Sequence, residues 1–412
     1  MLRPAADVAL SRRIQWLLFR TLALCVALAV SGPMPAPAYA SVVEAPAATA
    51  LRLTLPPPTG NHRIGVLPLH LVDRDRPDPW VASKPARELM VSLWYPARRT
   101  HARPVFPWLT PGAWDRFGQD NGFPPGSVRV PLTHGRLDAP VDRKRGGRPL
   151  VLYSPGLGGN RDSSSVLVEQ LVSRGYVVAT IDHTYDASEV EFPNGRVEVA
   201  LPSVTLDVAA KAMAVRVADT RFVLDSLIAL NAGRNPDAER RPLPAGLRGM
   251  FNPARVGMFG HSLGGATAGQ AMYQDRRIRA GTNLDGTMFG SVVERGLHRP
   301  FMLVAAQNHG RDNDPSWERF WANLRGWQLN LRLTDSGHNS FTDVQVLLPQ
   351  IAGVLNLPPG TVQQLIGTID PHRSVVNQRA YVRAFFDLHL RHRCRHLLDR
   401  PSPRFPEMQF LP

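Results

Sequence analysis

A glycine-flanked serine turn, residues 260–265 (GHSLGG), constrains the fold of this chain more than any other feature. It directly follows an apolar run at 255–259 and directly precedes an Ala-rich segment that starts at Ala266. A G-x-S-x-G sequence between a strand and a helix is typical of a sharp turn, because the glycines let the two elements pack closely while the serine projects from the end of the sheet. The dipole of the following helix favours negative charge at that point. The turn therefore predicts a nucleophilic serine, Ser262, at the end of a buried strand.

Strand-like and helical segments alternate around this turn. Apolar runs of strand length are separated by segments in which apolar residues recur at helical spacing. We predict strands at 63–72, 88–95, 149–153, 176–181, 255–259, 279–284, 300–306 and 329–333, and helices at 164–174, 204–230 and 381–390. This alternation is typical of a single α/β domain with a mostly parallel central sheet and helices on both faces. Residues 97–147 lack a sustained period, and we predict a long surface connection there.

A serine nucleophile needs a general base, and the base needs an orienting carboxylate. In hydrolases with this turn the chain order is serine, acid, histidine. His338 lies in the loop just after the last predicted strand, where the base is expected. His298 precedes a strand and so lies at the opposite end of the sheet, and His309 stands where an acid is expected. We therefore predict His338 as the base.

The residues alone leave the acid open. Asp285 ends the predicted strand 279–284, and Asp312 and Asp314 follow the next strand. Both places are at the carboxyl end of the sheet, and both are used for the acid among hydrolases. Asp335 shares the loop of His338, which makes it a poorer orienting group.

The oxyanion hole of such a site takes one backbone N–H from the residue after the nucleophile, here Leu263. A second N–H is expected from a loop after an earlier strand. The Gly-rich turn at 154–159 (SPGLGG) has that position, and Leu157 is its predicted donor. This turn lacks the Lys-Ser/Thr of a P-loop and the spacing of a dinucleotide fingerprint, so it does not predict a nucleotide site.

The N-terminal forty residues have the pattern of a signal peptide. Arg12 and Arg13 precede the apolar stretch 21–30, and an A-x-A sequence ends at Ala40. The apolar stretch is shorter than the roughly 20 residues that a membrane-spanning helix needs. We therefore expect cleavage near Ala40 and a secreted or periplasmic protein, by a general or a twin-arginine export route. We divide the chain into a signal peptide (1–40), a flexible N-terminal segment (41–59), an α/β domain (60–395) and a C-terminal tail (396–412).

The composition argues against several other classes of protein. The chain has 48 Lys and Arg against 34 Asp and Glu, a formal net charge of +14. The arginines are scattered and belong to no nucleic-acid motif, so we expect no nucleic-acid partner. Two cysteines cannot form a disulfide framework or a cysteine-based zinc site. His389, His392 and His396 have helical spacing, but the arginines among them oppose a cation, so we expect no metal and no cofactor.

Short motifs along the chain resemble those of the secreted (plasma-type) platelet-activating-factor acetylhydrolase family and its bacterial lipase-like members, in the α/β-hydrolase superfamily. They occur in the family's order and cover roughly residues 60–395. The motifs are LWYP at 93–96, SPGLGG at 154–159, IDH at 181–183, Arg216-x-x-Asp219, LDSL at 224–227, GHSLGG at 260–265, NLDG at 283–286, His338-x-x-Phe341-x-Asp343, and Ile369-Asp370 before the C-terminal helix.

The resemblance implies a role for each site residue. It places the acid at Asp285, the base at His338 and the oxyanion amides at Leu157 and Leu263, with Asp312 as a minor alternative. The turn at 154–159 departs from the family in beginning with Ser-Pro, where a histidine is common.

The resemblance also implies an activity. We expect a secreted serine esterase that cleaves short-acyl phospholipids or related lipid esters through an acyl-enzyme, without a cofactor or calcium. Its expected partners are a lipid or other ester substrate and, transiently, lipid surfaces, with no obligate protein partner. A triacylglycerol lipase or a cutinase-like polyester hydrolase would share these catalytic residues and differ in pocket and lid. A non-catalytic binding protein on the same fold typically loses a member of the triad, and this chain retains the whole set.

Overall fold

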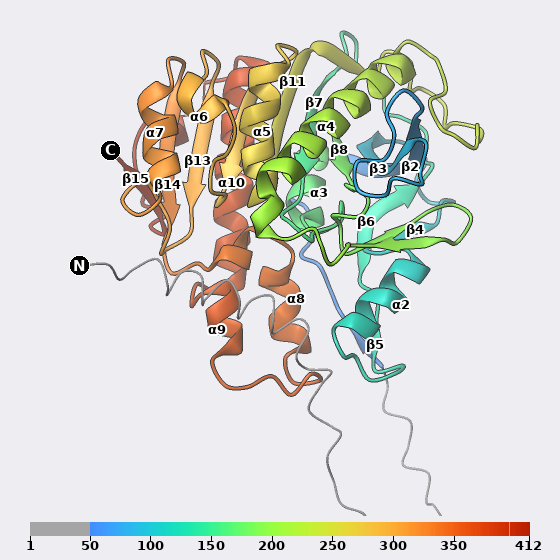
Figure 1. Ribbon diagram of the computed structural model, residues 1–412, viewed down its shortest axis with the longest axis horizontal. Coiled ribbons are helices and arrows are strands. Elements are labelled where there is room, and N and C mark those ends of the chain that lie inside the picture. Colours follow the sequence, from blue (N-terminus) through green and yellow to red (C-terminus); the bar gives the residue numbers. More distant parts are fainter. Residues whose placement is uncertain (1–49, 395) are drawn as a thin grey trace, which may run out of the picture.

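An eleven-stranded sheet forms the centre of the protein, in a computed structural model that describes residues 50–394 and 396–412 (Figure 1). The strands lie in the order β15-β14-β13-β12-β11-β7-β8-β3-β2-β6-β4. Their bounds are β2 (Arg63–Asp73), β3 (Arg87–Ala97), β4 (Val105–Pro107), β6 (Leu132–Leu137), β7 (Arg148–Ser154), β8 (Val177–Ile181), β11 (Phe251–His261), β12 (Ile278–Leu284), β13 (Phe301–Ala305), β14 (Gln328–Leu333) and β15 (Met408–Leu411). The neighbours from β8 across to β14 all run parallel, whereas β3 is antiparallel to both β2 and β8, and β15 is antiparallel to β14. The predicted mostly parallel sheet is confirmed.

Helices cover both faces of this sheet, as predicted. One face carries α4 (Ala209–Asn231), α5 (Leu263–Gln274), α6 (Val292–Arg295) and α7 (Pro315–Asn323), in front of the strands in Figure 1, and the other carries α3 (Ser165–Ser173) and α10 (Pro371–Arg391). The side chains of β7 alternate between the two cores. Leu150 and Leu152 pack on the α4 and α5 side, and Val151 and Tyr153 pack on the α3 and α10 side. Burial on both faces explains why the central strands are continuous apolar runs.

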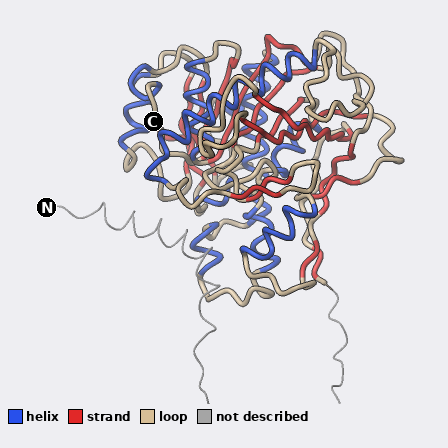
Figure 2. Tube along the Cα trace, turned by 45° about the vertical axis from the view of Figure 1, so that its right-hand side comes forward, coloured by secondary structure: helices blue, strands red, loops and turns tan. Residues whose placement is uncertain are grey.

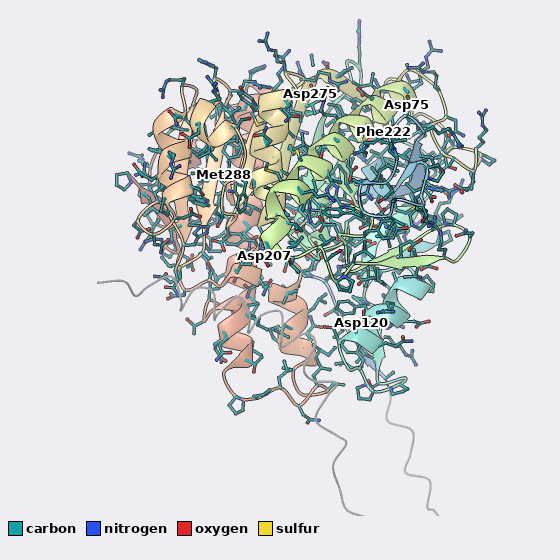
Figure 3. All side chains as sticks on the ribbon, viewed as in Figure 1. Asp75, Asp120, Asp207, Phe222, Asp275 and Met288 are labelled. Atoms are coloured by element: carbon teal, nitrogen blue, oxygen red, sulfur yellow. The ribbon has the colours of Figure 1, made fainter. Side chains whose placement is uncertain are left out.

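Three more helices lie beyond the carboxyl ends of the central strands: α2 (Pro111–Asp120), α8 (Val344–Ile351) and α9 (Thr361–Ile366). Figure 2 shows them as a group below the sheet. Trp108, before α2, and Leu347 of α8 belong to one small apolar core that joins this group to the rest. In Figure 3, Asp275, just after α5, lies near the top of the molecule, and Asp120, at the end of α2, lies in its lower half. The carboxyl ends of the strands therefore face the α2, α8 and α9 side.

The predicted surface connection at 97–147 is corrected by the structure. It contains β4 and β6, which extend one edge of the sheet, together with α2 and β5 (Val128–Arg129), a strand outside the central sheet. Helix α2 was missed because its ten residues include Pro111, Gly112 and Gly118, which are poor helix formers. Its aromatic side chains, Trp114 and Phe117, are half-buried. The remaining small elements are β9 (Glu189–Glu191), β10 (Val197–Val199), η2 (Leu206–Val208), η3 (His338–Phe341) and η4 (His396–Leu398).

Both predicted terminal segments are also corrected. Within the predicted flexible segment 41–59, β1 (Leu51–Arg52) pairs with β5, and Leu53 and Leu55 are buried. The predicted tail 396–412 contributes β15, which adds an edge strand to the sheet. Such short elements bury few side chains each, so their apolar pattern is too brief to be recognised.

The predicted signal peptide 1–40 lies outside the described residues, as does 41–49. Among the helices that the structure does describe, none combines the length and the apolar character needed to cross a membrane.

Candidate active site

Ser262 occupies the tight turn that the sequence predicts, between the end of β11 and the start of α5. Its backbone has φ 54° and ψ −125°, a conformation that residues with a side chain rarely adopt. Close packing holds it there: a Cβ at Gly260 would lie 2.1 Å from the backbone of Gly264, and a Cβ at Gly264 would lie 1.9 Å from the carbonyl oxygen of Ser154. Only glycine fits at both positions. The strand and the helix can therefore meet closely enough to project Ser262, which is half-buried, from the carboxyl edge of the sheet.

His338 and Asp285 meet at the same edge, from two different loops. Asp285 follows β12, and His338 begins η3 after β14. His338 Nδ1 donates to Asp285 Oδ2 at 2.5 Å. Burial favours the neutral form of Asp285, but the hydrogen bonds from His309 and His338 outweigh burial and hold the pKa of Asp285 well below its usual value. The ionised carboxylate of Asp285 thus accepts a hydrogen bond from Nδ1 of His338.

The other candidate acids lie elsewhere. Asp312 is exposed and accepts from Arg332 at 2.9 and 3.1 Å. Asp314 accepts from His309 Nε2 at 2.9 Å. Asp335 lies just after β14. Its backbone carbonyl accepts the N–H groups of Thr368 and Ile369, in the segment before α10. In the described part of the chain, Asp285 is the carboxylate bound to His338.

His261 fixes the backbone of His338 beside Ser262. Its Nε2 donates to the carbonyl oxygen of His338 at 2.9 Å, and the two imidazole rings lie 4.5 Å apart between centroids. Burial, reinforced by the charge of His338, lowers the pKa of His261 to about 3, so this ring stays a neutral donor. The hydroxyl of Ser262 forms no hydrogen bond with the residues that the structure describes. Hydrogen bonds between a nucleophile and its base often tighten only when substrate is bound.

The turn at 154–159 approaches the nucleophile from the neighbouring strand β7. A Cβ at Gly156 would lie 3.2 Å from Ser262 Cβ, so the backbone of this turn lies against the serine. The amides of Leu157 and Leu263 form no hydrogen bond with other parts of the described chain, and Leu263 is the first residue of α5, where N–H groups have no partner inside the helix. Both predicted oxyanion donors therefore have no hydrogen-bond partner in the described part of the chain.

A buried arginine of α4 orients this turn. Arg216 binds both oxygens of Asp186 at 2.6 Å and donates to the carbonyl oxygens of Pro155 and of Gly156, the latter at 2.9 Å. The carbonyl of Gly156 and the N–H of Leu157 belong to one planar trans peptide and point in opposite directions. Because the carbonyl faces Arg216, the Leu157 N–H is turned away from Arg216.

A second Ser-His-Asp arrangement lies beneath the turn and is fully buried. Ser154 Oγ donates to His183 Nε2 at 2.9 Å, and His183 Nδ1 donates to Asp219 Oδ2 at 3.0 Å. Asp219 also accepts from Arg87 at 2.9 and 3.2 Å. All four side chains are buried, so the Ser154 hydroxyl is out of reach of a substrate. This chain of bonds anchors the start of the turn at 154–159. The sequence contains Ser154, His183 and Asp219 in three of the quoted motifs, SPGLGG, IDH and Arg-x-x-Asp, without indicating that they meet.

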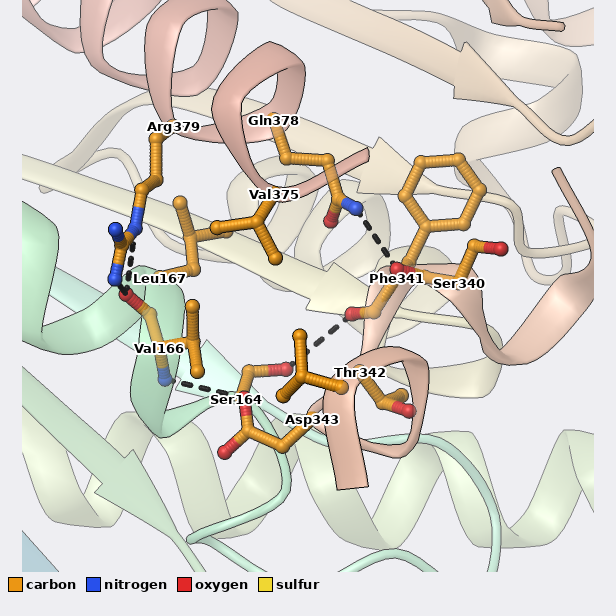
Figure 4. A pocket seen from close by; sticks show the side chains of 11 residues that line it. Ser164, Val166, Leu167, Ser340, Phe341, Thr342, Asp343, Val375, Gln378 and Arg379 are labelled. Atoms are coloured by element: carbon orange, nitrogen blue, oxygen red, sulfur yellow. Dashed lines mark hydrogen bonds between the residues drawn. The ribbon is translucent and has the colours of Figure 1, made fainter. Parts of the chain in front are cut away.

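The segment after His338 is tied to α3 and α10 (Figure 4). Gln378 donates to the carbonyl oxygen of Ser340 at 2.8 Å, and Asp343 accepts the N–H groups of Ser165 and Val166 at 2.8 and 3.1 Å. Burial raises the pKa of Asp343 to about 7, against the effect of these hydrogen bonds. The loop that carries His338 is thus held at its far end by two helices.

An apolar cavity, open to solvent, lies between α2 and the α8 and α9 pair. Its aromatic wall comes from Trp108, Trp114, Phe117 and Phe123, and its aliphatic wall comes mainly from α8 and α9. Residue Leu365 of this lining also contacts the His338 loop, since a Cβ at position 337 would lie 2.7 Å from the Leu365 carbonyl oxygen. The cavity therefore adjoins the loop of the predicted base.

Two other histidine predictions have defined environments. His309, the rival base, has both ring nitrogens bound to carboxylates and has none free for Ser262. His389, from the candidate metal group, packs against Trp327 and Phe385 at 4.5 and 4.9 Å between ring centroids. In the part of the chain that the structure describes, no group of His, Cys, Asp and Glu is arranged to hold a metal ion.

Comparisons with known proteins relate this chain to ester hydrolases. The family model described as platelet-activating factor acetylhydrolase, isoform II, matches residues 124–392. A protein of Arthroderma benhamiae described as a probable 1-alkyl-2-acetylglycerophosphocholine esterase is 31% identical over 389 residues, which are 87% of this chain and 93% of that protein. A platelet-activating factor acetylhydrolase of Cavia porcellus is 26% identical over 251 residues, 55% of each chain. The solved structure of a ferulic acid esterase from Streptomyces cinnamoneus superposes with a TM-score of 0.73 and 35% identity, covering 87% of this chain and 99% of that one.

Proposed function

The chain belongs to the platelet-activating factor acetylhydrolase, isoform II, family and is a carboxylic ester hydrolase; from this premise we propose that it is a secreted serine esterase acting on short-acyl phospholipids or related lipid esters. The observation that carries the proposed mechanism is the 2.5 Å hydrogen bond between His338 and Asp285, on a loop that His261 holds beside Ser262.

In this mechanism the Ser262 hydroxyl attacks the ester carbonyl while His338 takes its proton. Asp285 keeps the proton on His338 Nδ1, so that Nε2 is the basic nitrogen, and stabilises the imidazolium that forms. The amides of Leu157 and Leu263 bind the oxyanion of the tetrahedral intermediate. The C–O bond to the alcohol then breaks, and His338 gives its proton to the leaving oxygen. A water molecule, activated by His338, hydrolyses the acyl-enzyme and releases the acid.

The proposed substrate class rests on a relative and on the apolar cavity. The Arthroderma benhamiae relative is described as acting on 1-alkyl-2-acetylglycerophosphocholine, which joins a short acyl group to a long apolar chain. The cavity beside the His338 loop offers such a chain an apolar surface, while the short acyl group occupies the space at Ser262. An aryl ester is a second candidate, because the similar solved structure is a ferulic acid esterase and the cavity has an aromatic wall.

An ester series tests the substrate proposal. The wild-type protein and Ser262→Ala are compared on acetyl to long-acyl esters, a short-acyl phosphatidylcholine, methyl ferulate and an insoluble polyester. The proposal predicts activity that is highest on short-acyl substrates, the phospholipid included, and that Ser262→Ala abolishes. A preference for long acyl chains or for the polyester indicates a lipase or a polyester hydrolase, and a preference for methyl ferulate indicates an aryl esterase.

Export is proposed from the sequence pattern at 1–40. Mass spectrometry of the protein recovered from outside the cytoplasm would give an N-terminus near residue 41. Recovery of the uncleaved chain from the cytoplasm alone would contradict it.

A further inference from the structure

Two histidines share the carboxylate of Asp285. His338 donates to Oδ2 at 2.5 Å, and His309 Nδ1 donates to Oδ1 at 2.8 Å, where the N–H of Ala306 also donates at 2.7 Å. The proposed mechanism uses only the bond to His338. Any effect of His309 on His338 is therefore transmitted through Asp285.

His309 is held between two carboxylates. Its second ring nitrogen, Nε2, donates to Asp314 Oδ2 at 2.9 Å. An ionised carboxylate can only accept, so both ring nitrogens must carry a proton and the ring is an imidazolium. Burial opposes this charge, but the hydrogen bonds to Asp285 and Asp314 outweigh burial and raise the pKa of His309 to about 9. At neutral pH, His309 is therefore a cation hydrogen-bonded to Oδ1 of Asp285.

The surroundings of His309 keep it in place. Asp314 is the N-cap of α7 and also accepts from Ser316 N and Oγ at 2.9 and 2.6 Å. The ring of His309 lies 4.6 Å from the Trp317 ring, and its backbone carbonyl accepts from Arg332 of β14 at 3.3 Å. Four charged or titratable groups therefore surround His309. They are Asp285 after β12, Asp314 at the N-cap of α7, Arg332 in β14 and His338 after β14.

We infer that His309 and Asp314 form a positioning pair that fixes Asp285 and sets the pH range in which His338 acts as a base. The inference rests on the proposed function. A cation on Oδ1 reduces the negative potential that Asp285 presents to His338, so the charged form of His338 is less favoured.

The pH dependence of kcat/KM tests this pair. His309→Gln replaces the cation with a neutral group that can still donate, and Asp314→Asn keeps the N-cap while removing one carboxylate from His309. We expect the acid limb of kcat/KM to move upward by about one pH unit in His309→Gln, and in the same direction by less in Asp314→Asn. Relative to activity on the plateau, activity well below the limb falls about tenfold in His309→Gln. Asp312→Asn, on the same loop but bound to Arg332, is the control and should leave the limb in place.

An equal loss of kcat/KM at every pH in His309→Gln would overturn the inference, because a merely structural role has no such pH signature. A second measurement is independent of ester hydrolysis. NMR titration of the histidine rings in the intact protein should show His309 protonated on both nitrogens at pH 8, and should show His338 protonated to higher pH in His309→Gln than in the wild type. A neutral His309 at pH 8, or an unchanged His338, overturns the inference even if no ester is cleaved. Survival of activity in Ser262→Ala would instead count against the proposed function.

Discussion

Asp285 accepts three hydrogen bonds on its two oxygens, two of them from histidines. In Asp285→Asn, one carboxylate oxygen is replaced by an NH₂ group, which cannot accept a hydrogen bond. An imidazole N–H that faced this oxygen then faces a donor instead. The Nδ1 proton of His338 then loses its partner, and the ring can adopt the wrong tautomer. We expect kcat to fall about 10⁴-fold with a small change in KM. The measurement is steady-state kinetics on an acetyl ester, with near-ultraviolet circular dichroism to verify the fold, and a loss below tenfold would contradict the assignment of the acid.

The buried cation His309 also predicts how stability depends on pH. Its pKa in the folded protein, about 9, lies above the ordinary value of 6.5. Its charge therefore stabilises the folded state fully below pH 6.5, and this contribution is lost as the pH rises through 9. We expect the free energy of unfolding of the wild type to exceed that of His309→Gln by an amount that falls by on the order of 2 kcal/mol between these pH values. Urea denaturation of both proteins at several pH values measures it, and a constant difference would show that His309 is not charged.

Single residues differed in how far the sequence could place them. Ser262 and His338 follow from their positions after strands, and the structure brings both to one edge of the sheet. Asp285 was distinguished from Asp312 only by the family resemblance, because both follow parallel strands. The hydrogen bond from His309 to Asp285 could not be predicted from the sequence. It depends on the exact position of a loop side chain beside one carboxylate oxygen.

At the scale of elements, α4 supports the turn at 154–159 through Arg216. Lysine cannot reproduce the five-donor fork that binds Asp186 and two backbone carbonyls together. We expect Arg216→Lys to lower kcat about 100-fold while KM changes little, because the Leu157 amide is no longer held toward the oxyanion. Arg221→Lys, on the exposed side of the same helix, is the matched control. Equal effects of the two variants, or a change confined to KM, would contradict this account.

Elements buried on both faces were the best predicted. Strands β7, β8, β12, β13 and β14 and helix α3 lie within one residue of their predicted bounds, because a long apolar run has few alternatives in an α/β fold. Strand β11 begins at Phe251, four residues before the predicted start at 255. The C-terminal helix α10 begins at Pro371, well before the predicted 381, and Asp370 caps it by accepting from the N–H of Arg373. Helix α2 and strands β1, β5 and β15 were missed, since their partners are distant in sequence and each covers little apolar surface.

At the scale of the whole molecule, the parallel sheet gathers the chemistry at one edge. Ser262, Asp285 and His338 follow three different strands, β11, β12 and β14, whose carboxyl ends coincide because the strands run parallel. The α2, α8 and α9 group lies beyond the same edge and adds the apolar cavity. In the proposed function, the long apolar chain of the substrate lies in this cavity, which adjoins the His338 loop.

Covalent labelling of the nucleophile tests the central claim most directly. The intact protein is treated with an organophosphate ester, residual esterase activity is followed, and peptides are mapped by mass spectrometry. We predict complete loss of activity with one phosphoryl group on the peptide containing Ser262, no label in Ser262→Ala, and slow labelling when His338 is replaced by glutamine. Full activity in a protein that takes no label, or inactivation with the label on another residue, would contradict the account.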